Sequence, residues 1–146
     1  QYEISNYAKQ GYMCRHNAGY WQRREYLGFG LGASSLYREL RFSNTRRMQE
    51  YLTDSGKLEQ IRKEVTVLSR NEQIEEFMFL GLRMTEGISE KLFKETFGVR
   101  IMDIYGDILQ KYEAIGFMEH IETKWCLTRK GIHVSNHILA DFLLDE

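Results

Sequence analysis

The feature that most constrains the fold is an unbroken apolar stripe between residues 101 and 115. Apolar side chains recur there every three or four residues, which is the spacing of one face of an α-helix, so the segment predicts a helix that buries this face. Gly116 follows at once and favours the end of that helix. The stripe consists of Ile101, Ile104, Tyr105, Ile108, Leu109, Tyr112 and Ile115.

Two helices are predicted before the stripe. Ser69 and Glu72 have the spacing of a capping box, and apolar residues follow at helical spacing until Gly87, where we expect the first helix to stop. Ser89 can cap a second, shorter helix, which Gly98 closes.

A hairpin and a last helix are predicted after the stripe. "FMEHI" and "KWCL" are two short β-prone runs on either side of a turn at residues 122–124. The resulting order of helix, short extended link, helix, helix, hairpin and helix is that of a winged helix. Thr128 can cap the last helix, which is expected to bury Val134, Ile138, Leu139, Phe142 and Leu143.

The charges of the predicted third helix argue against nucleic-acid binding. In a winged helix this element would read the nucleic acid, yet its interior carries Asp103, Asp107 and Glu113 against Lys111 alone. Because phosphate binding needs clustered Lys and Arg, we expect no nucleic-acid partner. A winged-helix regulatory or docking module stays open as a hypothesis.

The first half of the chain differs in charge and in pattern. Residues 1–69 hold eleven Lys and Arg against seven Asp and Glu, whereas residues 70–146 hold nine against fourteen, so the halves are expected to face different partners. "YEISNYA" (2–8) and "EYLGFGLGASSLY" (25–37) are typical of strands, and a helix is predicted from Asn44 or Thr45 to about Thr53. The expected fold class is α+β and mainly helical.

Several function classes are disfavoured by the sequence. No apolar run approaches the length of a membrane span. Cys14 and Cys126 lie far apart and form no CxxC pair, which favours reduced thiols in a cytoplasmic protein. "GFGLGA" matches a dinucleotide-binding pattern only weakly, because no crossover helix follows it. His133 and His137 lack a third ligand nearby and are expected to be solvated.

The segment "CRHNAGYWQRREYLGFGLGASS" (14–35) carries the strongest candidate site. His16 could bind a metal or haem iron, with Asn17 orienting it and with Tyr20 and Trp21 offering flat surfaces to a macrocycle. On the residues alone, a structural histidine in a loop, among packed aromatic side chains, is the favoured interpretation.

These motifs also carry a resemblance. "YEISNYA", "HNAGYW" and "YLGFGLGASS" resemble the end of the catalytic barrel in the oxygen-independent coproporphyrinogen III oxidase-like family of radical S-adenosylmethionine (SAM) proteins, and "FMFLGLRMTEGI", "YEAIGF" and "LTRKGIHVSNHILADFL" resemble its C-terminal domain. The resemblance implies an incomplete barrel end at residues 1–45, a helix and linker at 46–69, and a winged-helix-like domain at 70–146.

The "HNxxYW" motif is characteristic of the haem chaperone-like branch of that family. The resemblance therefore implies haem or porphyrin binding and delivery, with His16, Asn17, Tyr20 and Trp21 at the site and His16 as the iron ligand. It places Gly28, Gly30 and Gly32 near the SAM site. The alternative is a true coproporphyrinogen III dehydrogenase, which oxidatively decarboxylates propionates.

One departure from the family pattern is large. The family holds a [4Fe–4S] cluster on a CxxxCxxC motif, which this sequence lacks. We therefore expect the chain to be a C-terminal fragment that is inactive alone and binds haem at most weakly. Its partner would be the missing N-terminal barrel, and its unpaired strands could join copies into an oligomer.

Overall fold

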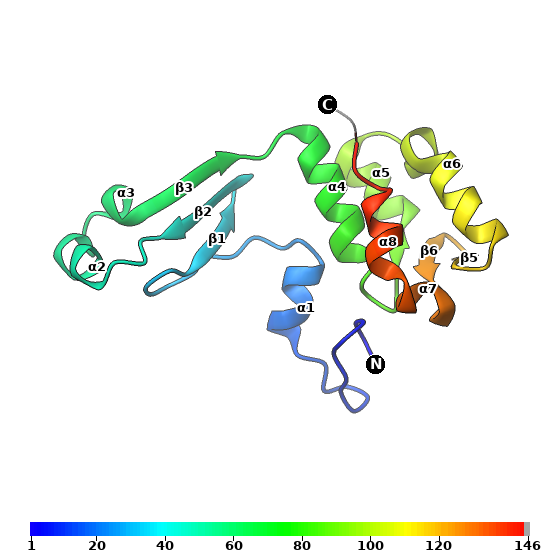
Figure 1. Ribbon diagram of the computed structural model, residues 1–146, viewed down its shortest axis with the longest axis horizontal. Helices are drawn as coiled ribbons and strands as arrows, with labels where there is room; N and C mark the ends of the chain where they lie inside the picture. Colours follow the sequence, from blue (N-terminus) through cyan, green and yellow to red (C-terminus); the bar gives the residue numbers. More distant parts are fainter. Residues whose placement is uncertain (145–146) are drawn as a thin grey trace. The chain divides into compact units, whose positions relative to one another are not determined.

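The computed structural model describes residues 1–144, which divide into two compact units (Figure 1). One unit combines residues 1–23 with the chain from residue 74 onward, and the other comprises residues 24–73. The first 23 residues thus pack with a part of the chain that follows them by some fifty positions. The sequence boundaries at residues 45 and 69 stay a prediction.

The first unit contains the predicted winged helix. Its elements are α4 (Arg70–Gly81, which begins in the other unit), β4 (Ile88–Ser89), α5 (Glu90–Phe97), α6 (Ile101–Ala114), β5 (Met118–Ile121), β6 (Lys124–Leu127), α7 (Arg129–His133) and α8 (Ser135–Ala140). The three strands form an antiparallel sheet in the order β4-β6-β5, in which the hairpin β5–β6 is the wing. The α+β class with a winged-helix-like C-terminal part is confirmed.

The core of this unit lies beneath the apolar face of α6. Ile101, Tyr105, Leu109 and Tyr112 are all nearly inaccessible to solvent, as the stripe predicted, whereas Ile115 is exposed at the end of the helix. Other buried side chains come from α4, α5, the wing, α8 and the turn after α8, among them Ile74, Met78, Phe93, Phe97, Met118, Trp125, Ile138 and Phe142. Burial of this apolar face stabilises the unit.

Local signals fix several helix ends in this unit. The capping box is present, because the Ser69 amide donates to Glu72 Oε2 (2.7 Å) and the Glu72 amide donates to Ser69 Oγ (3.3 Å). Ser89 caps α5, and Gly98 ends it in the left-handed conformation. Thr128 Oγ1 accepts the Gly131 amide (3.1 Å) at the start of α7.

Two predictions about helix ends in this unit were wrong. The helix α4 ends at Gly81, not at Gly87, because the chain turns there to enter β4. The predicted last helix is divided into α7 and α8 at Val134, whose backbone (φ −119°, ψ 18°) is not helical. Val134 and Leu143 are exposed, whereas Ile138 is buried as expected.

The second unit is built on another antiparallel sheet, in the order β1-β2-β3. Its strands are β1 (Ser34–Tyr37), β2 (Leu40–Asn44) and β3 (Arg62–Val67), with α2 (Met48–Asp54) and α3 (Leu58–Ile61) between the last two. Arg38 and Glu39 form the two-residue turn between β1 and β2, both with positive φ (51° and 60°). This is the turn geometry that suits the twist of a tight hairpin.

Three predictions about the first half were wrong. Residues 2–8 form a tight turn with isolated bridges instead of a strand. In the segment 25–37 only Ser34–Tyr37 is a strand, because residues 27–33 form a loop with Gly30 and Gly32 at positive φ. The helix α2 starts at Met48, since Asn44 still belongs to β2.

No helix within residues 1–144 is long and apolar enough to cross a membrane.

Candidate functional site

All four residues of the predicted haem site lie on one short helix, α1 (Arg15–Trp21, sequence RHNAGYW). The helix has only two turns, and its N-cap residue, Cys14, makes no side-chain capping bond. Residues four apart lie on the same face of a helix, so His16 and Tyr20 are neighbours. Ala18 is buried and anchors the opposite face.

His16 is exposed and is hydrogen-bonded to Tyr20. The Tyr20 hydroxyl lies 2.9 Å from His16 Nε2, and the two rings meet edge to face with 4.8 Å between their centroids. The hydroxyl can donate to Nε2 when the imidazole is neutral and carries its proton on Nδ1. An exposed neutral imidazole of this kind can act as a metal ligand.

Asn17 and Trp21 contact residues other than His16. The amide of Asn17 donates to the Tyr2 hydroxyl (3.1 Å), so it ties α1 to the N-terminal turn and does not orient the imidazole. The ring of Trp21 lies under the guanidinium of Arg83, 4.6 Å from its centroid. The Trp21 Nε1 atom is buried and has no hydrogen-bond partner within residues 1–144.

Arg83 also contacts a buried carboxylate that sequence reasoning missed. Glu3 is fully inaccessible to solvent. Its Oε1 accepts Arg83 Nε (2.8 Å) and lies 2.6 Å from Arg83 Nη2, while its Oε2 accepts the Ser5 amide (2.9 Å) and Asn6 Nδ2 (2.6 Å). Burial raises the pKa of Glu3, but the bonds from Ser5, Asn6 and Arg83 outweigh it, so the pKa lies below its ordinary value.

The three glycines of the predicted SAM site lie in the other unit, on the loop before β1. A Cβ at Gly28 would collide with the Ser34 carbonyl, and Gly30 (φ +103°) and Gly32 (φ +67°) adopt conformations that favour glycine. The Asn44 amide holds the loop by donating to the carbonyls of Gly28 (3.3 Å) and Gly30 (2.9 Å). The backbone of the loop therefore explains the glycines, and they do not share one face of a strand.

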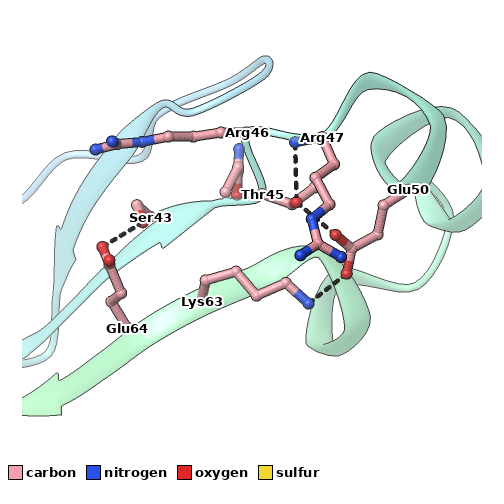
Figure 2. Close-up of a pocket in the computed structure, with 8 residues that line it drawn as sticks. Ser43, Thr45, Arg46, Arg47, Glu50, Lys63 and Glu64 are labelled. Carbon is pink, nitrogen blue, oxygen red and sulfur yellow. Dashed lines mark hydrogen bonds and ion pairs between the residues drawn. The ribbon is translucent and has the colours of Figure 1, made fainter.

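A polar pocket of 430 Å³ lies where β2 and β3 meet α2 (Figure 2). Glu50 lies on the side of the pocket next to α2, where it accepts the Thr45 hydroxyl (2.6 Å) and pairs with Lys63. Ser43 donates to Glu64 (3.1 Å) at the other end. Because Glu50 pairs with Lys63 and Glu64 is bonded to Ser43 on the neighbouring strand, we interpret the pocket as a brace for the sheet and not as a cofactor site.

The residues present do not fit an iron–sulfur cluster. Within residues 1–144 no three His, Cys, Asp or Glu side chains come close enough together to hold a metal ion. Cys14 is exposed on the N-terminal side of α1, whereas Cys126 is buried in β6. His133 and His137 are exposed. Two of the exposed histidines have an aromatic neighbour: His16 lies beside Tyr20, whereas His120 stacks on Trp125 with 4.5 Å between the ring centroids and has its Nε2 atom 3.2 Å from Glu90 Oε1.

Comparison with known proteins defines the class of the winged-helix-like unit. Residues 68–134 match the HemN C-terminal domain. The chain also resembles a solved structure described as "Coproporphyrinogen III oxidase (HemN) from Escherichia coli is a Radical SAM enzyme", with a TM-score of 0.64 and 16% identity over 82% of this chain and 28% of that one. At this identity the likeness concerns the fold.

Curated relatives narrow the family further. The "Heme chaperone HemW" of Bacillus subtilis is 34% identical over 98% of this chain, that of Lactococcus lactis 33% over 99%, and that of Escherichia coli 29% over 99%. These matches confirm the resemblance that the motifs carry, to the oxygen-independent coproporphyrinogen III oxidase-like family of radical SAM proteins and its haem chaperone-like branch. The chain spans 38% of the length of each of these three relatives.

Proposed function

We propose that this chain is the haem-handling part of a longer radical SAM protein that binds haem and delivers it to an acceptor. The observation that carries the proposal is the exposed imidazole of His16, presented on α1 with Tyr20 beside it. The three curated relatives described above are each named as haem chaperones, which supports the same function.

The residues of α1 would divide the work between them. His16 would supply a neutral nitrogen to haem iron, which when bound provides the coordination site and the visible spectrum. Coordination through Nε2 would replace the hydrogen bond from the Tyr20 hydroxyl, and the freed tyrosine ring could then lie against the macrocycle. Asn17 and Trp21 would hold the helix in place through Tyr2 and Arg83.

The loop with Gly28, Gly30 and Gly32 would contribute backbone to the SAM site of the full-length protein. Glycines, which lack a side chain, allow a ligand to approach a backbone closely. The cluster that reduces SAM needs a cysteine set that this chain does not hold. The resemblance to the family supports both cofactors in the longer protein.

A haem titration of the full-length protein tests the proposal. We expect a Soret band that shifts on binding, and His16→Ala should abolish or shift this band because one axial bond is lost. His133→Ala is the matched control, since it removes another exposed histidine and should leave the spectrum unchanged.

The same protein should be assayed for conversion of coproporphyrinogen. No turnover is expected from a haem chaperone. Turnover together with unchanged haem spectra in His16→Ala would overturn the proposal and favour the dehydrogenase.

A further inference from the structure

Three separated motifs meet at the side chain of Arg83. Glu3 comes from "YEISNYA", Trp21 from "HNAGYW", and Arg83 from "FMFLGLRMTEGI" in the link between α4 and β4. The guanidinium pairs with the carboxylate of Glu3 and lies over the ring of Trp21. We propose that the HemN C-terminal domain positions the helix of His16, and that Arg83 is the positioning residue; this inference rests on the proposed function of that helix.

The helix α1 is too short to be stable by itself. It has seven residues and no side-chain cap, and an isolated helix of that length is unstable in water because the nucleation of the first turn is costly. Its position therefore depends on contacts with the rest of the unit.

Contacts from the C-terminal domain reach α1 at its C-terminal end. The last residue of α1, Trp21, stacks against Arg83. Two residues later, Arg23 Nε donates to Glu76 Oε2 on α4 (3.1 Å), and both side chains are mostly buried. Two cationic side chains therefore connect the domain to the helix. Arg83 of the domain contacts Trp21, and Arg23, just after the helix, contacts Glu76 of the domain.

The N-terminal turn contacts α1 and is itself hydrogen-bonded to the link between α4 and β4. The Ile4 amide donates to the Arg83 carbonyl (3.0 Å), and the Thr85 amide donates to the Tyr2 carbonyl (3.1 Å). Tyr2 in turn accepts the Asn17 amide with its hydroxyl (3.1 Å). The link after α4 therefore fixes α1 both directly and through residues 2–4.

The chemistry of Arg83 explains why this position needs arginine. Glu3 is fully buried, so its negative charge requires a partner with several donors. A planar guanidinium can bond a carboxylate along its edge and stack on an aromatic ring with its face at the same time. A lysine ammonium can balance the charge but cannot make both contacts in a fixed geometry.

The test uses Arg83→Lys and Arg83→Met in the full-length protein, with Arg100→Lys as the control. Arg100 lies in the same domain and is paired at the surface with Asp103, away from the contacts of α1. We expect Arg83→Lys to weaken haem binding about tenfold and Arg83→Met to weaken it more, because neighbouring groups that act together couple on this scale. Arg100→Lys should leave haem affinity unchanged.

A double mutant separates positioning from general damage. If Arg83 acts through His16, the loss caused by Arg83→Lys should disappear in a His16→Ala background, where there is no imidazole to position. An equal fold-loss in both backgrounds would overturn the inference, as would unchanged affinity in both Arg83 variants.

Hydrogen exchange tests the positioning independently of haem. The amides of Ala18 and Gln22 are bonded within α1, and their exchange should accelerate at least about tenfold in Arg83→Met while the amides of α6 stay protected. Unchanged exchange at Ala18 and Gln22 would refute the role of Arg83. Accelerated exchange in a protein that does not bind haem would refute the proposed function instead and leave the positioning role intact.

Discussion

A substitution at Gly87 tests how closely the α4–β4 link packs on the wing. Gly87 has a φ of +67°, and a Cβ added there would overlap the Trp125 carbonyl oxygen and come within 2.5 Å of Cys126 Sγ. Two costs therefore combine in Gly87→Ala: a left-handed backbone for alanine, about 1–2 kcal/mol, and displacement of the wing backbone, about 1–3 kcal/mol. We expect a total loss of about 2–5 kcal/mol in the free energy of unfolding.

Gly98→Ala is the matched control for this experiment. Gly98 has nearly the same φ (+72°), but a Cβ there would meet nothing within 4 Å. Only the backbone cost applies, so its loss should be about 1–2 kcal/mol.

Urea unfolding of both variants, followed by far-ultraviolet circular dichroism, measures the difference. Gly87→Ala should be less stable than Gly98→Ala by at least about 1 kcal/mol. Equal unfolding free energies for the two variants would refute the close contact between Gly87 and the wing.

Three further predictions concern single interactions. Because the folded pKa of Glu3 is lowered, its contribution to stability is present above the ordinary carboxyl value of 4.5 and is lost as the pH falls through the folded pKa. The stability advantage of the wild type over Glu3→Gln should therefore narrow over that pH range. A difference that stays constant with pH in urea titrations would contradict this. Ser69→Ala should cost about 0.5–2 kcal/mol in the same assay, since it removes the acceptor for the Glu72 amide, and no loss would argue against the cap. Cys14 should react with a thiol reagent at once, whereas Cys126, which is buried and has a raised pKa, should react only on unfolding; equal rates in the native protein would show that β6 opens readily.

The winged-helix part could be predicted from the sequence because its signals are local. The stripe of α6, the capping box at Ser69 and the cap at Thr128 each depend on residues a few positions apart. Such signals agree with one another along residues 69–128, so the order of elements followed from them.

The first half could not be predicted in the same way, because distant contacts decide its structure. "YEIS" alternates like a strand, but Glu3 is buried against Arg83, eighty residues away, and the segment turns to enclose it. The hairpin β1–β2 was missed because Arg38 and Glu39 form its turn without a glycine or asparagine. The motif HNAGYW stays a predicted site, but its helical form and the contact of its Trp21 with Arg83 required the structure.

The most direct test of the central claim is chemical rescue of the ligand at residue 16. Haem would be added to the full-length His16→Ala protein with increasing free imidazole, and the Soret band would be compared with that of the wild type. If His16 is the axial ligand, imidazole should restore the wild-type band in His16→Ala. The spectrum of His133→Ala should match that of the wild type and should not change when imidazole is added. A His16→Ala spectrum identical to the wild type before any imidazole is added would contradict the account and leave His16 as an ordinary surface histidine.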